Sequence, residues 1–241
     1  LLIAGEYIIL REKGAGLAAA LDIRLQAKSE PAKNGSLTVI GLFGRKKVEW
    51  RGTSGPAGLI PTIVAVIEEK YQLQSLPSLK ITLDSRLFYD LDGRKLGFGS
   101  SAAAGTALLA LLEAEIRGSL PDKEELLQTA VAAHRRAQGG RGSGYDIACS
   151  LFGGTGLFRG GAQPDWQHLD LPWLQYLELH NFAQPVSSGA AVQAFEHFQQ
   201  QHPEKAEEFH NRNNRILLSF VNDPRRSVGL ELLAQSRALG I

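Results

Sequence analysis

The alternation of apolar and polar positions divides the chain into a first part that is rich in strands and a later part that is rich in helices. Apolar residues alternate with polar ones from Leu79 to Leu87, which predicts a strand, and they recur at helical spacing from Leu59 to Tyr71. Further strands are predicted at Leu1–Leu10, Leu17–Ala27, Ser36–Leu42, Lys47–Arg51 and Leu174–Leu179, and further helices at Ser101–Arg117, Asp122–Gln138, Ala190–Gln200, Pro203–Phe220 and Arg225–Leu239. Strands followed by helices favour an α+β fold, with a domain boundary near residue 160.

Composition and charge exclude several classes of partner. The 241 residues carry 26 Lys and Arg against 25 Asp and Glu, a formal net charge of +1, whereas nucleic-acid binders usually have a concentrated basic surplus. The apolar stretch Ala102–Leu112 is too short to span a bilayer, so we expect neither a nucleic-acid nor a membrane partner. The single cysteine, Cys149, cannot form an internal disulfide, which fits a cytoplasmic protein.

A glycine-serine loop, Gly97–Ala103, leads directly into the helix predicted to begin at Ser101. Unpaired N–H groups and the helix dipole make a helix N-terminus suitable for phosphate, and glycines let the backbone approach an anion. Taken alone, the loop fits phosphate binding and a structural turn equally well. A dinucleotide-binding fingerprint is disfavoured because the polar run Asp90–Lys95 precedes the loop where a strand is needed, and a Walker A loop lacks its Gly-Lys-Ser/Thr ending.

A second glycine-rich stretch, Gly139–Gly144, follows a predicted helix and leads to Asp146. Arg141 could contact phosphate, and the Asp146 carboxylate could accept or orient the proton of a substrate hydroxyl. The alternative for Asp146 is a cap of the next helix, and His134 alone fits a surface or supporting position better than a catalytic one.

Taken together, these stretches resemble the GHMP kinase superfamily and, within it, most closely the phosphomevalonate kinases. The loop Gly97–Ala103, the N-terminal Gly5-Glu6-Tyr7 and the segment Ser143–Asp146 with Gly153-Gly154 match that superfamily's three motifs in order. The resemblance implies two domains: an N-terminal one like ribosomal protein S5 domain 2 at residues 1–160, and a ferredoxin-like C-terminal one at residues 161–241 that is only partly present.

The resemblance also implies an ATP- and Mg²⁺-dependent cytoplasmic kinase with a small acidic acceptor, phosphomevalonate. Mevalonate kinase, another small-molecule kinase of the superfamily and a catalytically degenerate nucleotide-binding protein are the alternatives. Asp146 is then the catalytic aspartate and Ser101 a magnesium ligand. The ATP-binding residues expected are Lys95, Gly97, Gly99, Ser100, Ser101 and Ala102, and the substrate-binding residues expected are Glu6, Arg141, Ser143, Gly144 and Ser188. For Ser188, a helix N-cap is the alternative.

Three departures from the family pattern bear on this prediction. The family's N-terminal lysine would fall before Leu1, and its C-terminal glycine-rich motif would fall after Ile241. Where mevalonate kinases have a magnesium-binding glutamate, this chain has His134-Arg135. The residues leave the oligomeric state open.

Overall fold

The computed structural model describes residues 1–33, 35–140, 142–176, 178, 188–223, 225, 227–229, 231–232 and 234. The chain forms two compact units, which we call the central unit (residues 21–152) and the terminal unit (residues 1–20 and 153–241). Each unit combines a four-stranded sheet with helices, so the predicted α+β class is confirmed. The two units are separated in the sequence after residues 20 and 152. The domain boundary near residue 160 stays a prediction.

The sheet of the central unit has the strand order β3-β6-β4-β5. Its strands are β3 (Gln26–Pro31), β4 (Thr38–Phe43), β5 (Lys46–Arg51) and β6 (Leu79–Asp84). β4 and β5, both predicted as strands, pair antiparallel, and β4 runs parallel to β6 while β3 runs antiparallel to it. Side chains along β6 alternate between buried and more exposed positions, so one face of the strand packs into a core.

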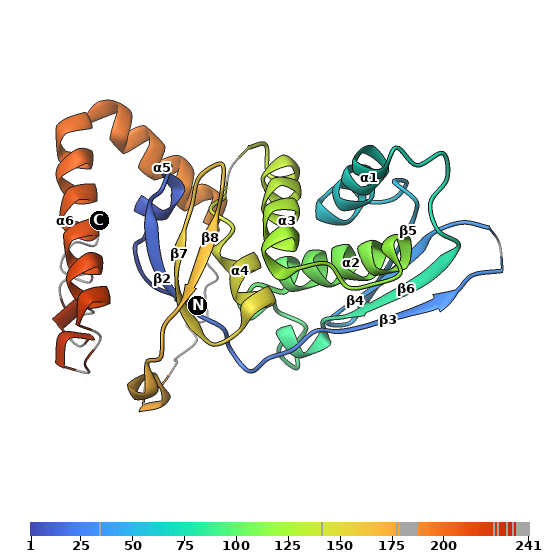
Figure 1. Ribbon diagram of the computed structural model, residues 1–241, viewed down its shortest axis with the longest axis horizontal. Helices are drawn as coiled ribbons and strands as arrows, with labels where there is room; N and C mark the ends of the chain where they lie inside the picture. The colour runs from blue at the N-terminus through green and yellow to red at the C-terminus, as the bar shows by residue number, and fades with distance from the viewer. Residues whose placement is uncertain are drawn as a thin grey trace. The chain divides into compact units, whose positions relative to one another are not determined.

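Four helices complete the central unit: α1 (Leu59–Tyr71), α2 (Ser100–Arg117), α3 (Lys123–Ala137) and α4 (Tyr145–Phe152). Figure 1 shows α1, α2 and α3 along one side of this sheet, and α2 contacts both β3 and β6. The predictions for α1, α2 and α3 are confirmed to within a residue at each end. Asp122 caps α3 by accepting a hydrogen bond from the Glu124 N–H at 2.9 Å, as its position in the sequence suggests.

A cluster of charged side chains around a buried carboxylate links the three longest helices of the central unit. The Glu113 side chain on α2 is 1% exposed and lies 2.7 Å from the Lys70 ammonium on α1 and 3.6 Å from the Arg117 guanidinium. The Tyr71 hydroxyl also donates to Glu113. Glu125 on α3, 40% exposed, pairs with both Lys70 and Arg117. Glu113 therefore has a structural role, and the Lys70 pKa is raised by its carboxylate partners despite partial burial.

The terminal unit has an antiparallel sheet of order β1-β2-β7-β8, formed by β1 (Leu2–Ala4), β2 (Ala15–Ala19), β7 (Thr155–Arg159) and β8 (Asp165–His168). The strand predicted for Leu1–Leu10 is wrong beyond Ala4. Gly5 and Tyr7 take positive φ angles of 97° and 63°, which end the strand, and a 3₁₀ helix follows at Ile8–Leu10.

Two long helices belong to the terminal unit, α5 (Ser188–Gln201) and α6 (Pro203–Asn222), and both confirm their predictions. Leu217 and Phe220 of α6 pack with Leu17 of β2 in the core of this unit. Elsewhere on α6, His210 is 2% exposed and lies edge-on to Phe195 of α5, with ring centroids 5.5 Å apart. Neither ring nitrogen of His210 has a hydrogen-bond partner among the described residues.

Two other strand predictions differ from the structure, and one helix prediction can be compared with it only in part. The single strand expected at Leu17–Ala27 is two strands of different sheets, since β2 ends at Ala19 and β3 begins at Gln26. The strand expected at Leu174–Leu179 is wrong over its first residues, where Pro172–Tyr176 form a 3₁₀ helix, and residues 177 and 179 lie outside the described part. The helix expected at Arg225–Leu239 also lies largely outside it.

Candidate functional site

The glycine-serine loop leads into the N-terminus of α2, as the sequence predicts. Gly97 and Gly99 have φ angles of 81° and 76°, a backbone region that suits glycine. The first hydrogen bond within the helix runs from the Ala103 N–H to the Gly99 carbonyl at 3.1 Å. The N–H groups before Ala103 thus have no acceptor within the helix, and Gly99, the N-cap, has no side chain to cap them. These donors, together with the helix dipole, are suited to binding an anion.

The first turn of α2 separates buried from accessible side chains. Ser100 and Ala102 face the core and are 3% and 0% exposed, so their contribution to a ligand comes chiefly from the backbone. Ser101 is exposed and its hydroxyl is accessible. Among the described residues, nothing lies within 4 Å of a Cβ built on Gly97, so the loop has open space on that side. This arrangement fits a phosphate chain on the N–H groups and a hydroxyl ligand at Ser101.

Asp146 lies beside this loop, although 47 positions separate it from Gly99 in the sequence. It occupies the first turn of α4, and its Cβ is 3.8 Å from the position that a Cβ would take on Gly99. The fold of the central unit therefore brings one carboxylate next to the N-terminus of α2. The structure thus brings the glycine-serine loop and Asp146 together, while phosphate binding by the loop and catalysis by Asp146 stay predictions.

Ser143 and Gly144 precede α4 and pack against α3. Ser143 is 7% exposed, and the Gly144 carbonyl accepts the first hydrogen bond of α4, from the Ala148 N–H at 3.1 Å. Gly144 has a φ of 90°, and a Cβ there would lie 2.6 Å from a methyl of Val131. Only glycine fits this position without a shift in the backbone.

The terminal unit holds two of the other predicted site residues. Glu6 is exposed in the turn after β1, and Ser188 is the first residue of α5. Arg141 lies outside the described residues. Their roles in substrate binding stay predictions.

Two basic residues precede the loop in the central unit. Lys95 is exposed and bridges to Tyr89 through the backbone. Arg86 is paired with Asp84, with its Nε 2.9 Å from Oδ1. The Asp84 carboxylate has a pKa below its ordinary value chiefly because Arg86 donates to it. Lys95 is thus the more accessible of the two cations for a nucleotide.

Sequence reasoning missed the contacts that hold the second glycine stretch. Arg135 donates from Nε to the Gly142 carbonyl and from Nη2 to the Ser143 carbonyl, both at 3.1 Å. Basic residues in the last turn of a helix before a glycine loop often bond to carbonyls, so the sequence held a general signal. It could not tell which of Arg135 and Arg136 faces the loop.

Two features are absent from the described residues: a cluster of metal-ligating side chains and a membrane-spanning helix. No three His, Cys, Asp or Glu side chains come together there in an arrangement suited to a metal ion. Within the same ranges, no helix combines the length and apolar character needed to cross a bilayer.

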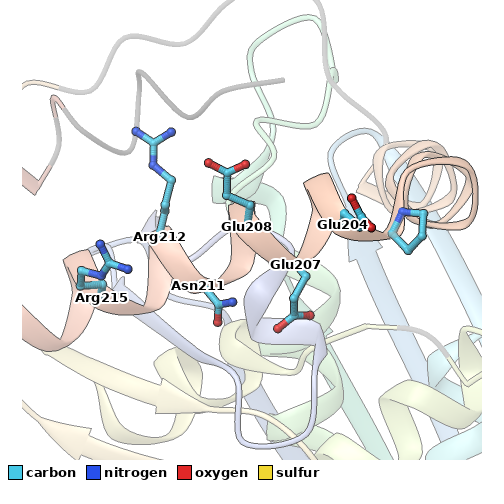
Figure 2. A pocket seen from close by; sticks show the side chains of 7 residues that line it. Glu204, Glu207, Glu208, Asn211, Arg212 and Arg215 are labelled. Carbon is cyan, nitrogen blue, oxygen red and sulfur yellow. The ribbon is translucent and has the colours of Figure 1, made fainter.

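A hollow also runs along α6 in the terminal unit. Figure 2 shows Glu208 and Arg212 on one side of the helix and Glu207 and Asn211 on the other. Glu207 is already paired with Arg11 at 2.8 Å, which lowers the pKa of its carboxyl. None of the residues that line this hollow belongs to the predicted site, so we assign it no role in the chemistry.

Comparison with known proteins gives relatives among the kinases of the mevalonate pathway. Residues 59–154 match the family described as "GHMP kinases N terminal domain". The mevalonate kinase of Archaeoglobus fulgidus is 26% identical over 245 aligned positions, which cover all of this chain and 78% of that protein. The phosphomevalonate kinase of Saccharolobus solfataricus is 38% identical over 96 positions, 39% of this chain and 29% of that protein. A phosphomevalonate kinase of a Streptomyces species is 29% identical over 64% of this chain and 46% of its own length.

Solved structures agree on the fold. Streptococcus pneumoniae phosphomevalonate kinase, crystallised with phosphomevalonate and AMPPNP, superposes with a TM-score of 0.78 at 16% identity, covering 99% of this chain and 77% of that one. The Lin0012 protein of Listeria innocua gives a TM-score of 0.76 at 20% identity, with coverage of 99% and 75%. Residues 59–154 therefore match the N-terminal domain of the GHMP kinases, and the chain has the fold of the GHMP kinases.

Proposed function

We propose that this chain is an ATP-dependent kinase that transfers the γ-phosphoryl group to phosphomevalonate. The observation that carries the proposal is the position of Asp146 beside Gly99, at the N-terminus of α2. The N-terminus of α2 would bind the phosphates, and Asp146 would supply a carboxylate beside them, which is the minimal set for phosphoryl transfer by positioning and charge. The match to the family and the phosphomevalonate kinases among the relatives support it.

In the central unit, we propose that one set of residues binds the nucleotide and another set binds the acceptor. The N–H groups of Ser100, Ser101 and Ala102 would hold the phosphates, with Lys95 adding positive charge and the Ser101 hydroxyl contacting Mg²⁺. A bound Mg²⁺ would neutralise charge on the phosphate oxygens. Asp146 would orient the acceptor, with Ser143 and Gly144 forming the wall beside it.

Residues outside these elements are assigned to the acceptor by the resemblance. Glu6, Arg141 and Ser188 are proposed to bind its carboxylate, hydroxyl or phosphate groups. An acceptor that is a phosphate monoester is already largely ionised near neutral pH, so it needs little help from a base. Asp146 would then act mainly by orientation and charge. Cytoplasmic location belongs to this proposal as well.

Mevalonate is the second candidate acceptor, because the mevalonate kinase of Archaeoglobus fulgidus aligns with the whole chain. Its acceptor group is an alcohol that must lose a proton during transfer, so a base contributes more, on the order of 10²–10⁴-fold. The two acceptors therefore predict different sensitivities to loss of the Asp146 carboxylate.

An ADP-release assay with mevalonate, phosphomevalonate, galactose and homoserine tests the proposal. We expect turnover with phosphomevalonate, and a loss of about tenfold in kcat for Asp146→Asn, smaller than the loss of a base would cause, with the KM for ATP little changed. Asp165→Asn, an exposed aspartate paired with Arg159, is the matched control and should keep full activity. Turnover with mevalonate alone would replace the acceptor, and an unchanged kcat for Asp146→Asn would remove its catalytic role.

A further inference from the structure

Two adjacent arginines at the end of α3 make different contacts. Arg136 points to α1, where it forms two hydrogen bonds of 2.7 and 2.8 Å with Glu69 in an exposed pair. Arg135 points instead to the second glycine stretch and bonds to the carbonyls of Gly142 and Ser143. Arg135 thus binds backbone carbonyls of the glycine stretch, whereas Arg136 binds a side chain of α1. Each arginine can therefore serve as a control for the other.

The segment Gly142–Gly144, to which Arg135 bonds, is rich in glycine and therefore needs outside contacts to adopt one conformation. Gly142 and Gly144 have φ angles of 100° and 90°, and glycine gives up more conformational freedom on ordering than any other residue. Gln138, the residue after α3, lies close to this segment: a Cβ on Gly142 would lie 2.6 Å from its Oε1. Hydrogen bonds from a charged donor are about twice as strong as neutral ones, so the Arg135 guanidinium binds these two carbonyls strongly.

The held segment determines where α4 begins. The Ser143 carbonyl that Arg135 binds is one residue before Gly144, whose own carbonyl accepts the first hydrogen bond of α4. Asp146 stands in that first turn, beside Gly99. A shift of the segment by a fraction of an ångström would move the carboxylate relative to the phosphate loop, and a misplacement of 1 Å can cost about 10²-fold in rate.

We propose that Arg135 is a positioning residue for phosphoryl transfer, which fixes Ser143, Gly144 and Asp146 by bonding to two carbonyls of the glycine stretch. The proposal rests on the proposed function for its effect on turnover. Its structural part, the ordering of residues 142–148 by the guanidinium, stands apart from any activity.

The test compares Arg135→Ala and Arg135→Lys with the control Arg136→Ala. Hydrogen exchange is measured on a peptide that covers residues 142–148, and kcat and KM are measured for acceptor and for ATP. For Arg135→Ala we expect about tenfold faster exchange in this peptide and a fall of about tenfold or more in kcat, with the KM for ATP within about twofold of the wild-type value. Arg135→Lys keeps the charge but lacks the planar fork of the guanidinium, so it should fall between the wild type and Arg135→Ala. Arg136→Ala should match the wild type in this peptide and in kcat.

The outcomes separate this proposal from the proposed function. Equal exchange in the Arg135 and Arg136 variants would overturn the ordering role, whatever the activity. Wild-type exchange and kcat in Arg135→Lys would overturn the need for the guanidinium fork, and this variant keeps the test decisive if Arg135→Ala does not fold. A wild-type protein without turnover on any acceptor would defeat the proposed function, while the exchange result would still decide whether Arg135 holds the segment.

Discussion

Gly144→Ala perturbs the candidate site through a single methyl group. The new Cβ would lie 2.6 and 2.9 Å from the two methyls of Val131, where unstrained carbon atoms stand about 3.5–4.0 Å apart. The φ of 90° adds a second cost, because an L residue in the left-handed region loses about 1–2 kcal/mol. Val131 is 1% exposed on a helix, where a β-branched side chain has one preferred rotamer, so it cannot turn aside cheaply.

The two costs can be separated with the chain's own residues. Overpacking of this kind costs about 1–3 kcal/mol, so strain and overlap together predict a loss of about 2–5 kcal/mol for Gly144→Ala. Gly139→Ala is the control for strain alone, since its φ is 68° and no described atom lies within 4 Å of the new Cβ; it should cost about 1–2 kcal/mol. Val131→Ala removes both clashing methyls and should therefore rescue Gly144→Ala but leave Gly139→Ala unimproved.

Urea denaturation of the four combinations of Val131→Ala and Gly144→Ala measures the coupling. We expect the double variant to be more stable than the sum of the single losses by about 1–3 kcal/mol, with acceptor turnover partly restored. A coupling below about 0.5 kcal/mol would refute the reasoning, because sites without direct contact add within that range.

Two further predictions concern stability. Glu113→Gln should cost about 2–4 kcal/mol, because it removes the charge from a buried ion pair, whereas Glu125→Gln, exposed and in the same cluster, should cost less than about 1 kcal/mol; equal shifts in urea midpoint would contradict this. Burial, with a smaller effect of Arg11, lowers the pKa of His210, and Glu207 opposes them. The unfolded chain therefore takes up this proton first as the pH falls below about 6.5, and stability should decline by up to about 1.4 kcal/mol per pH unit there and recover as pH rises. Thermal unfolding between pH 7.5 and 5.5 checks this, and a His210→Leu variant with the same slope as the wild type would exclude His210 as its source.

The sequence by itself determined the local elements and the candidate chemistry. Helical periodicity with a proline in the first turn was enough for α1, and Asp122 marked the start of α3, because both signals act within a few residues. The glycines of Gly97–Ala103 similarly indicated a backbone able to approach an anion. These inferences needed no knowledge of distant contacts.

Only the tertiary structure decided which of these elements meet. Gly99 and Asp146 lie on different helices, and their proximity depends on the packing of α2 with α4. The turn at Tyr7, where φ is positive within a β-prone run, was likewise not predicted from the sequence. Packing also decides that Arg135, and not Arg136, bonds to the glycine stretch. A sequence lists donors and acceptors along one dimension, whereas the direction of each side chain follows from the packing of the helix that carries it.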